Sequence, residues 1–200
     1  MPPLTDGPLE QLIRRLGRLP GLGPRSARRV ALHLLRHRES LMLPLAREME
    51  QVASRIRECD QCGNLDLHVP CHLCSDSSRD ASRICVVEDV ADLWAIERAA
   101  VYAGQYLVLG GVMNALDGIG PDQLRLPLLL ERASDAGVSE VILATSATVD
   151  GQTTAHYIAE KLAGLSVSIT RLAHGVPVGG ELNYLDDGTL AQAMRARRRV

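Results

Sequence analysis

The chain has 200 residues, enough to bury a substantial core in one domain or in two small ones. Aromatic residues make up only 2% and phenylalanine is absent, which argues against nucleic-acid binding by base stacking and favours binding to the backbone. The net charge is −2, but residues 1–57 carry eleven arginines against five acids, whereas residues 84–190 carry five basic residues against fourteen acids. This asymmetry favours a polyanionic partner for the N-terminal part.

Signals for export or for a membrane are missing from the sequence. The N-terminus shows no basic flank followed by an apolar region, and no run of about eighteen apolar residues occurs. We therefore expect a cytoplasmic protein without a membrane partner. The last ten residues add four arginines and no acid, and this tail either touches DNA or keeps a frayed end soluble.

Two helical patterns flank a tight turn near the N-terminus. Apolar residues recur at helical spacing over residues 8–19, and a second helical pattern covers residues 25–36. Between them, residues 19–24 read Leu-Pro-Gly-Leu-Gly-Pro, and two glycines with two prolines force a short connection. The sequence therefore predicts a helix-hairpin-helix.

Three arginines, Arg25, Arg28 and Arg29, lie in the first turns of the second predicted helix. In such a hairpin the glycines let the backbone approach a phosphate, and the helix directs its N–H groups and positive dipole end outward. We therefore predict sequence-independent DNA binding at these three residues. A hairpin that only packs or mediates oligomerisation is the alternative.

Residues 40–58 continue as a predicted helix that leads into two cysteine pairs. Cys59 and Cys62 are followed, after eight residues, by Cys71 and Cys74. Two CxxC pairs this close can place four thiolates at the corners of a tetrahedron, as structural Zn²⁺ requires. The loop holds too few aliphatic side chains for a core of its own, so metal binding must stabilise it. The sequence predicts one structural Zn²⁺ with these four ligands.

Other interpretations of the cysteines are two disulfides or unrelated free thiols, although nothing in the sequence indicates an oxidising compartment. With four cysteines available, we expect His68 and His72 to be bystanders or to support the ligands. The fifth cysteine, Cys85, lies inside a predicted strand, and we expect it to be a buried small hydrophobe.

A different periodicity follows residues 75–82, a polar stretch that we interpret as a linker. Segments that are apolar on both faces alternate with helical ones, which predicts an α/β domain with a mainly parallel sheet covered on both sides. The predicted strands are residues 84–87, 106–109, 141–144 and 167–170, and the predicted helices are residues 90–102, 127–136 and 153–162.

Acidic residues follow the predicted strands, at the edge where such sheets carry their sites. These acids are Glu88, Asp89 and Asp92 after the first strand, Asp117 and Asp122 after the second, and Asp150 after the third. A cluster of this kind can hold Mg²⁺ and orient a phosphoryl group. Carboxylates also occur at strand ends and helix N-termini because the helix dipole favours them. From the residues alone both interpretations stay open.

Five strings of the sequence carry a resemblance to one family. They are LPGLGP at residues 19–24, ICVVE at 84–88, LDGIGPD at 116–122, VILAT at 141–145 and AHGVPVGGEL at 173–182. With the order of parts, they make the chain similar to the RecR family of bacterial recombination mediators over nearly its whole length. The resemblance implies a helix-hairpin-helix region, a four-cysteine zinc finger, a Toprim domain and a C-terminal segment with oligomer contacts. The expected bounds are 1–57, 58–75, 82–177 and 178–200.

The resemblance also implies a non-enzymatic role in DNA repair. RecR proteins act with RecO and RecF at gaps and strand junctions, and help RecA to load where single-strand-binding protein had coated the DNA. They resemble ring-forming clamps, as dimers or closed tetramers. The family's basic pair falls on Arg25 and Arg29, with Arg28 as an extra charge. The Toprim glutamate and aspartate fall on Glu88 and Asp92, which we expect to contact a basic partner such as RecO, or Mg²⁺.

This sequence departs from Toprim enzymes in one decisive place. Those enzymes use an Asp-x-Asp pair after a later strand, whereas residues 145–150 read Thr-Ser-Ala-Thr-Val-Asp and offer one carboxylate. Two-metal chemistry needs several carboxylates, so a Mg²⁺-dependent phosphoryl-transfer enzyme, either a nuclease or a primase, is the weaker alternative. Residues 88–92 also lack the family's usual small residue and proline. No GxxxxGK[ST] motif occurs, and ATP hydrolysis is not expected.

Overall fold

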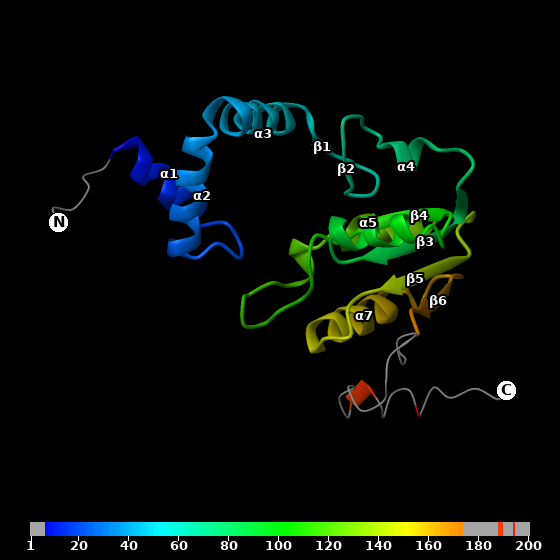
Figure 1. The fold of residues 1–200 in the computed structure, drawn as a ribbon. Coiled ribbons are helices and arrows are strands. Elements are labelled where there is room, and N and C mark those ends of the chain that lie inside the picture. The colour runs from blue at the N-terminus through cyan, green and yellow to red at the C-terminus, as the bar shows by residue number, and fades with distance from the viewer. Residues whose placement is uncertain (1–6, 174–187, 190–193, 195–200) are drawn as a thin grey trace. The chain divides into compact units, whose positions relative to one another are not determined.

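The structure is a computed structural model, and it describes residues 7–173, 188, 189 and 194. The chain divides into two compact units, Met1–Ile56 and Arg57–Val200. The first unit is helical, and the second contains a cysteine-rich loop followed by an α/β sheet (Figure 1). The predicted order of a helical hairpin, a four-cysteine loop and an α/β domain is therefore confirmed.

The predicted hairpin is formed by α1 (Pro8–Leu16) and α2 (Pro24–Arg36). Each helix has a proline in its first turn, where the missing N–H costs no hydrogen bond. In the connection, Leu22 N–H donates to Leu19 O at 3.1 Å, and Gly21 adopts a φ of +78°, which favours glycine. The turn therefore follows from the glycine and proline pattern of the sequence.

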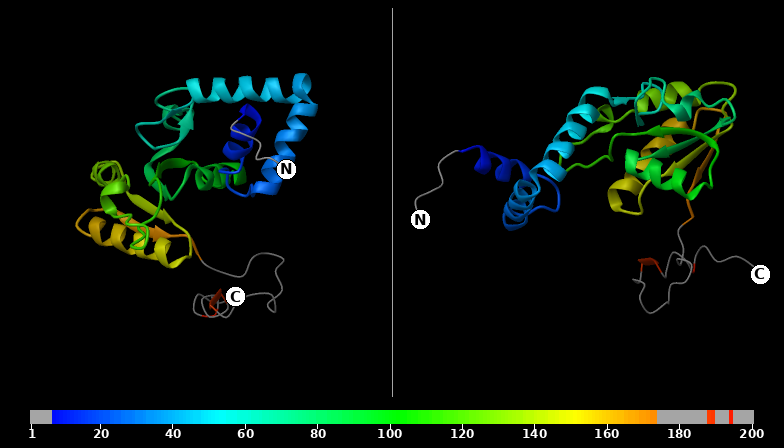
Figure 2. Two further views of the ribbon diagram at one scale, coloured as in Figure 1. Left: turned by 90° about the vertical axis from the view of Figure 1, so that its left-hand side faces the viewer. Right: turned by 45° about the horizontal axis from the view of Figure 1, so that its top comes forward.

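A small core joins the two hairpin helices, which lie side by side in Figures 1 and 2. Its buried members are Ile13, Ala27 and Ala31, with Leu12 and Leu16 packed against them. Two alanines at the contact let the helix axes approach closely, so little apolar surface is needed to hold the pair together.

The first unit continues through a π-helical turn, η1 (Arg38–Met42), into α3 (Leu43–Arg55). The helix predicted over residues 40–58 therefore ends earlier, because Arg57 and Glu58 pair as a strand. Every residue of α3 is described, and none is buried. Met49 and Val52 of its apolar stripe are 63% and 58% exposed.

The second unit opens with the cysteine-rich loop. Its regular elements are a two-stranded antiparallel ribbon, β1 (Arg57–Glu58) with β2 (Leu65–Asp66), and one turn of helix, α4 (His72–Ser75). The loop leads into a four-stranded sheet of order β4-β3-β5-β6, in which all neighbours are parallel. The strands are β3 (Asp80–Val87), β4 (Gly104–Val108), β5 (Glu140–Ala144) and β6 (Ser168–Arg171).

Helices cover both faces of this sheet, as predicted. They are α5 (Val90–Ala99), the 3₁₀ turn η2 (Pro121–Gln123), α6 (Leu126–Ala133) and α7 (Val149–Leu162). Side chains of β3 alternate between two core clusters: Ile84 and Val86 pack with α6 and α7, whereas Cys85 and Val87 pack with α5 and the metal-binding loop. In Figure 1, α5 and α7 lie on opposite sides of the sheet.

Most elements differ from their predicted bounds by a few residues, and two of these differences have a clear cause. Strand β3 begins at Asp80, inside the stretch interpreted as a linker, because Asp80 N–H donates to Ala103 O at 2.8 Å and pairs that residue with the sheet. Helix α7 begins at Val149 rather than Thr153, because the Thr148 hydroxyl accepts from Gly151 N–H at 3.1 Å and caps the helix. Cys85 is buried, as expected, and its burial raises its pKa to about 12.

Several predictions lie outside the described residues. These are the oligomer contacts of residues 178–200 and the role of the arginines of the tail, Arg195, Arg197, Arg198 and Arg199. Within the described part of the chain, no helix combines the length and apolar character needed to cross a membrane.

Candidate metal centre and nucleic-acid interface

The four cysteines of the loop converge on one point. The sulfur atoms of Cys59, Cys62, Cys71 and Cys74 all lie within 4.8 Å of one another. The Cys59–Cys74 and Cys62–Cys71 separations are 3.9 Å and 3.5 Å. Tetrahedral Zn–S bonds of about 2.3 Å imply sulfur separations of about 3.8 Å, so the group fits a metal ion. All four are free cysteines, and disulfides would need about 2.05 Å, so the disulfide interpretation is wrong.

Burial disfavours charge on the sulfur atoms, whereas backbone N–H groups donate to two of them. A hydrogen bond with Cys74, together with burial, raises the pKa of Cys62, and burial raises the pKa of Cys71 to about 11. A cation is therefore needed to hold these groups as thiolates at neutral pH. The backbone N–H groups of Asn64 and Cys71 donate to the sulfurs of Cys62 and Cys59, each at 3.4 Å.

Asp66 organises the loop between the two cysteine pairs. Its carboxylate accepts from the N–H groups of Leu67 at 2.6 Å and His72 at 2.9 Å, and His72 Nδ1 lies 2.5 Å away. The backbone bond and the ring contact of His72 hold the pKa of Asp66 well below its usual range. The ligand cluster contains neither His68 nor His72. His72 therefore supports the loop through Asp66.

The cysteine loop is attached to strand β4, which forms one edge of the sheet. Val108 N–H donates to Cys62 O at 2.7 Å, so the turn that carries two of the cysteines also completes the edge of the strand. Arg132 Nη1 donates to both Gln61 O and Tyr106 O at 2.7 Å. The loop and the sheet are thus joined by backbone groups and by one charged donor from α6.

A second set of contacts surrounds this attachment. Arg125 donates to Val108 O at 3.0 Å and also contacts the Glu58 carboxylate. The side chain of Asn64, which is fully buried, accepts from Trp94 Nε1 at 3.0 Å. These contacts attach the cysteine-rich loop to α5 and to the start of α6.

The predicted DNA-binding arginines all project from the start of α2. Arg25, Arg28 and Arg29 are exposed, and with Arg36 and two other α2 residues they line a hollow of about 380 Å³. The helix begins at Pro24 directly after the tight turn, so its unpaired N–H groups and these three arginines belong to its first two turns. The arrangement suits phosphate groups, which accept from guanidinium and backbone donors alike.

Glu88 and Asp92, two of the acids at the carboxyl ends of the strands, accept hydrogen bonds from backbone N–H groups. Glu88 Oε1 accepts from Ser146 N–H at 2.6 Å, and Asp92 Oδ2 accepts from Asp89 N–H at 3.0 Å in the capping box of α5. A Cβ built on Gly151 would lie 2.5 Å from Ser146 O and 2.7 Å from Glu88 Oε1, so the close approach of α7 to the Ser146 backbone requires glycine. Among the described residues, only the four cysteines form a group of three or more candidate metal ligands.

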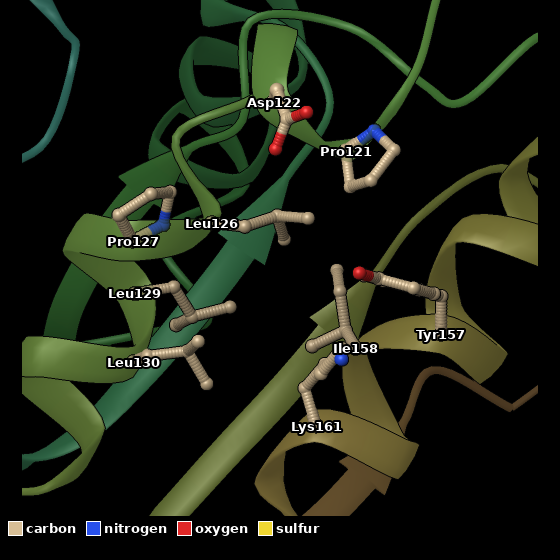
Figure 3. A pocket seen from close by; sticks show the side chains of 9 residues that line it. All are labelled: Pro121, Asp122, Leu126, Pro127, Leu129, Leu130, Tyr157, Ile158 and Lys161. Carbon is tan, nitrogen blue, oxygen red and sulfur yellow. The ribbon is translucent and has the colours of Figure 1, made fainter.

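An apolar cavity of about 160 Å³ lies between α6 and α7 (Figure 3). Aliphatic side chains such as Leu129 and Ile158 line it, and Lys161 Nζ lies 5.2 Å from the ring centre of Tyr157. Of the predicted acids, Asp122 alone is part of the described lining. The cavity therefore does not gather the carboxylates that phosphoryl transfer would need.

Sequence reasoning missed the residues that connect the loop to the sheet. Nothing in their local pattern marks Arg125 and Arg132, because their partners lie between 17 and 71 residues away along the chain. Asp66 could have been suspected, since an acid between the cysteine pairs of a short loop often accepts backbone N–H bonds.

Comparison with known proteins adds family membership to this geometry. The family described as "RecR, helix-hairpin-helix" matches residues 9–53, the Toprim domain family matches residues 82–173, and "RecR, C-terminal" matches residues 175–198. The Recombination protein RecR of Phenylobacterium zucineum is 62% identical over 195 residues, which cover 97% of this chain and 98% of that protein. The protein of the same name from Gluconobacter oxydans is 60% identical over 98% of this chain and 98% of that protein. The one from Paramagnetospirillum magneticum is 59% identical over 95% of this chain and 96% of that protein.

Proposed function

The chain belongs to the RecR family of recombination proteins, and from that premise we propose that it is a non-enzymatic, DNA-binding mediator of recombinational repair. As a homo-oligomer, either a dimer or a tetrameric ring, it acts with RecO and RecF on the nucleoid in the cytoplasm. There it helps to load RecA at gapped DNA or at DNA coated by single-strand-binding protein. The observation that carries this proposal is the exposed arginine group at the start of α2.

A gel shift of end-labelled gapped DNA in Mg²⁺ buffer tests the DNA-binding part. Each guanidinium–phosphate contact is worth about tenfold in affinity, so Arg25→Ala with Arg29→Ala should weaken binding by about a hundredfold. Arg47→Ala removes an equally exposed charge from α3 and is the matched control. Unchanged binding by the double variant would contradict the proposal.

The same experiment separates the mediator from an enzyme. DNA recovered from the shifted band and rerun under denaturing conditions should be full length. Shortened DNA that depends on Glu88 would favour the phosphoryl-transfer alternative. Glu88→Gln is the suitable variant, because the amide oxygen can still accept from Ser146 N–H while the charge is removed.

The cysteine cluster is proposed to hold one structural Zn²⁺. Four thiolates are the ligand set that Zn²⁺ prefers in closed sites, and Cys59, Cys62, Cys71 and Cys74 leave no position open for substrate. When bound, the ion supplies folding energy and no chemistry. Metal analysis of the purified protein should give one zinc per chain, and a different metal or none would overturn the assignment.

The acidic carboxyl end of the sheet is proposed to dock a basic partner, RecO, with Glu88 and Asp92 in the contact. Glu88→Gln with Asp92→Asn keeps both hydrogen bonds to the backbone but removes two charges. Capture of RecO should weaken and become less dependent on salt, while DNA binding stays unchanged. If this variant captures as much RecO as the wild-type protein does, these acids are not part of the interface. A comparison of Mg²⁺ binding by the variant and by the wild-type protein shows whether the ion binds at these acids.

A further inference from the structure

α1 carries a second arginine surface, separate from the α2 arginines that we propose to bind DNA. Gln11, Arg14, Arg15 and Arg18 recur at positions i, i+3, i+4 and i+7 and line a hollow of about 270 Å³. We call these four residues the α1 stripe. Like charges three and four residues apart repel each other on a helix. A surface that carries three arginines suits a polyanion such as a phosphate backbone.

The α1 stripe points away from α2. Leu12, Ile13 and Leu16 form the side of α1 that packs on the second helix. At 3.6 residues per turn, Gln11 and Arg15 lie about half a turn from Ile13, and Arg18 follows in the turn after the helix ends at Leu16. The stripe therefore occupies the outer side of α1.

The arginines of α2 are placed in the corresponding way on the other helix. Ala27 and Ala31 form the side of α2 that packs on α1, and Arg25 and Arg29 lie about half a turn from Ala27. The two hollows share no lining residue. The two basic surfaces thus lie on opposite outer sides of one helix pair.

We infer that the α1 stripe is a second binding site for a nucleic-acid phosphate backbone, so that one hairpin contacts two separate stretches of backbone. This inference rests on the proposed DNA-binding function. Guanidinium groups bind phosphates through paired N–H donors, and Gln11 adds a neutral donor. No aromatic side chain lines the described surface, so the site binds backbone without stacking bases. A gapped duplex or a strand junction offers the two backbone stretches.

The test measures anisotropy of fluorescent gapped DNA over a series of salt concentrations. Arg15→Gln keeps a good helix former on α1, and with Arg18→Gln in the turn after the helix it removes two charges. It should weaken binding about tenfold or more and reduce the slope of log affinity against log salt by about two. Arg15→Lys with Arg18→Lys should retain the slope, and Arg47→Gln should leave affinity and slope unchanged. When the α1 substitutions are combined with Arg25→Ala and Arg29→Ala, the fold-losses in affinity of the two pairs should multiply.

The outcomes separate this inference from the function on which it rests. If Arg15→Gln with Arg18→Gln binds DNA with wild-type affinity and salt slope, while Arg25→Ala with Arg29→Ala binds more weakly, the second site is wrong. The proposed function then still holds. Wild-type binding in both variants would overturn the proposed function as well. A loss in Arg47→Gln equal to that in the α1 variant would assign the effect to overall charge and also overturn the site. Circular dichroism of each variant shows that α1 and α2 are folded.

Discussion

The two compact units of this chain are held together in different ways. In the hairpin, the core consists of Ile13, Ala27 and Ala31, and arginines cover the outer sides of both helices. In the second unit, core clusters cover both faces of the sheet, and the metal-binding cysteines are themselves part of one cluster. The difference teaches that the hairpin leaves its charged side chains on the surface, whereas the second unit uses several of its polar groups for internal attachment.

The largest effect should come from removing the metal. Structural zinc contributes on the order of 10 kcal/mol to the folding of a small loop, so Cys62→Ser or chelation should unfold the cysteine loop and destabilise the sheet to which it is attached. Hydrogen exchange should rise across the loop and β4 but not in α1 and α2. Cys85→Ala, which removes a buried cysteine outside the cluster, should keep the metal. If hydrogen exchange rose equally in both units, the hairpin would depend on the metal as much as the second unit does, and the contrast between the units would be wrong.

Arg132→Ala tests the attachment of the loop to the sheet. The variant loses charge-assisted bonds to Gln61 O and Tyr106 O, at a cost of about 2–3 kcal/mol. Urea unfolding of the metal-loaded protein measures this cost. Arg98→Ala removes an exposed arginine from α5 and should change stability by less than about 0.5 kcal/mol. If both variants lose the same amount of stability, Arg132 does not attach the loop to the sheet.

Ala31→Leu tests the small core of the hairpin. Ala31 is fully buried between α1 and α2, so three added carbons must push the helices apart, at a cost of about 1–3 kcal/mol within this unit. Thermal unfolding followed by circular dichroism should show a transition at a lower temperature than in the wild-type protein. The metal content should be unchanged. Ala46→Leu adds the same carbons at an exposed position of α3 and should be neutral. An unchanged transition in Ala31→Leu would mean that the core has unused space.

The smallest effect concerns acid stability of the second unit. Burial alone would raise the pKa of Glu97, but its bonds with Arg79, at 2.6 Å and 3.1 Å, outweigh burial and lower that pKa below the ordinary value of 4.5. A carboxyl with a lowered folded-state pKa stabilises the fold above pH 4.5 and loses that contribution as the pH falls below it. Glu97→Gln should cost less than about 1 kcal/mol at pH 7, because the pair is partly exposed. In urea unfolding at pH 3 the difference from wild type should shrink, and a difference that grows would contradict the assignment.

Local chemistry explains what could be predicted from the residues alone. The two cysteine pairs are close enough in sequence for tight turns to bring all four sulfurs together, and the glycines and prolines of residues 19–24 leave the chain few conformations other than a hairpin. The apolar segments between helices likewise indicated a parallel sheet, because only strands covered on both faces tolerate such runs.

The roles of particular side chains could not be predicted in this way. From the sequence, Glu88 was equally suited to a metal site and to a strand end. Its actual contact is the N–H of Ser146, 58 residues away, and glycine at position 151 allows it. The start of α7 shifted by four residues because a hydroxyl cap outweighed the helical pattern.

The sequence by itself determined the order of the parts, the four sulfur ligands and the arginines at the start of α2, because spacing within a few residues sets each of them. Only the tertiary structure decided that Arg132 joins the metal-binding loop to β4, and that two arginine surfaces lie on opposite outer sides of one helix pair. These features depend on which strand forms the edge of the sheet and on which side of each helix is buried. Packing between distant segments sets both, and no local pattern records it.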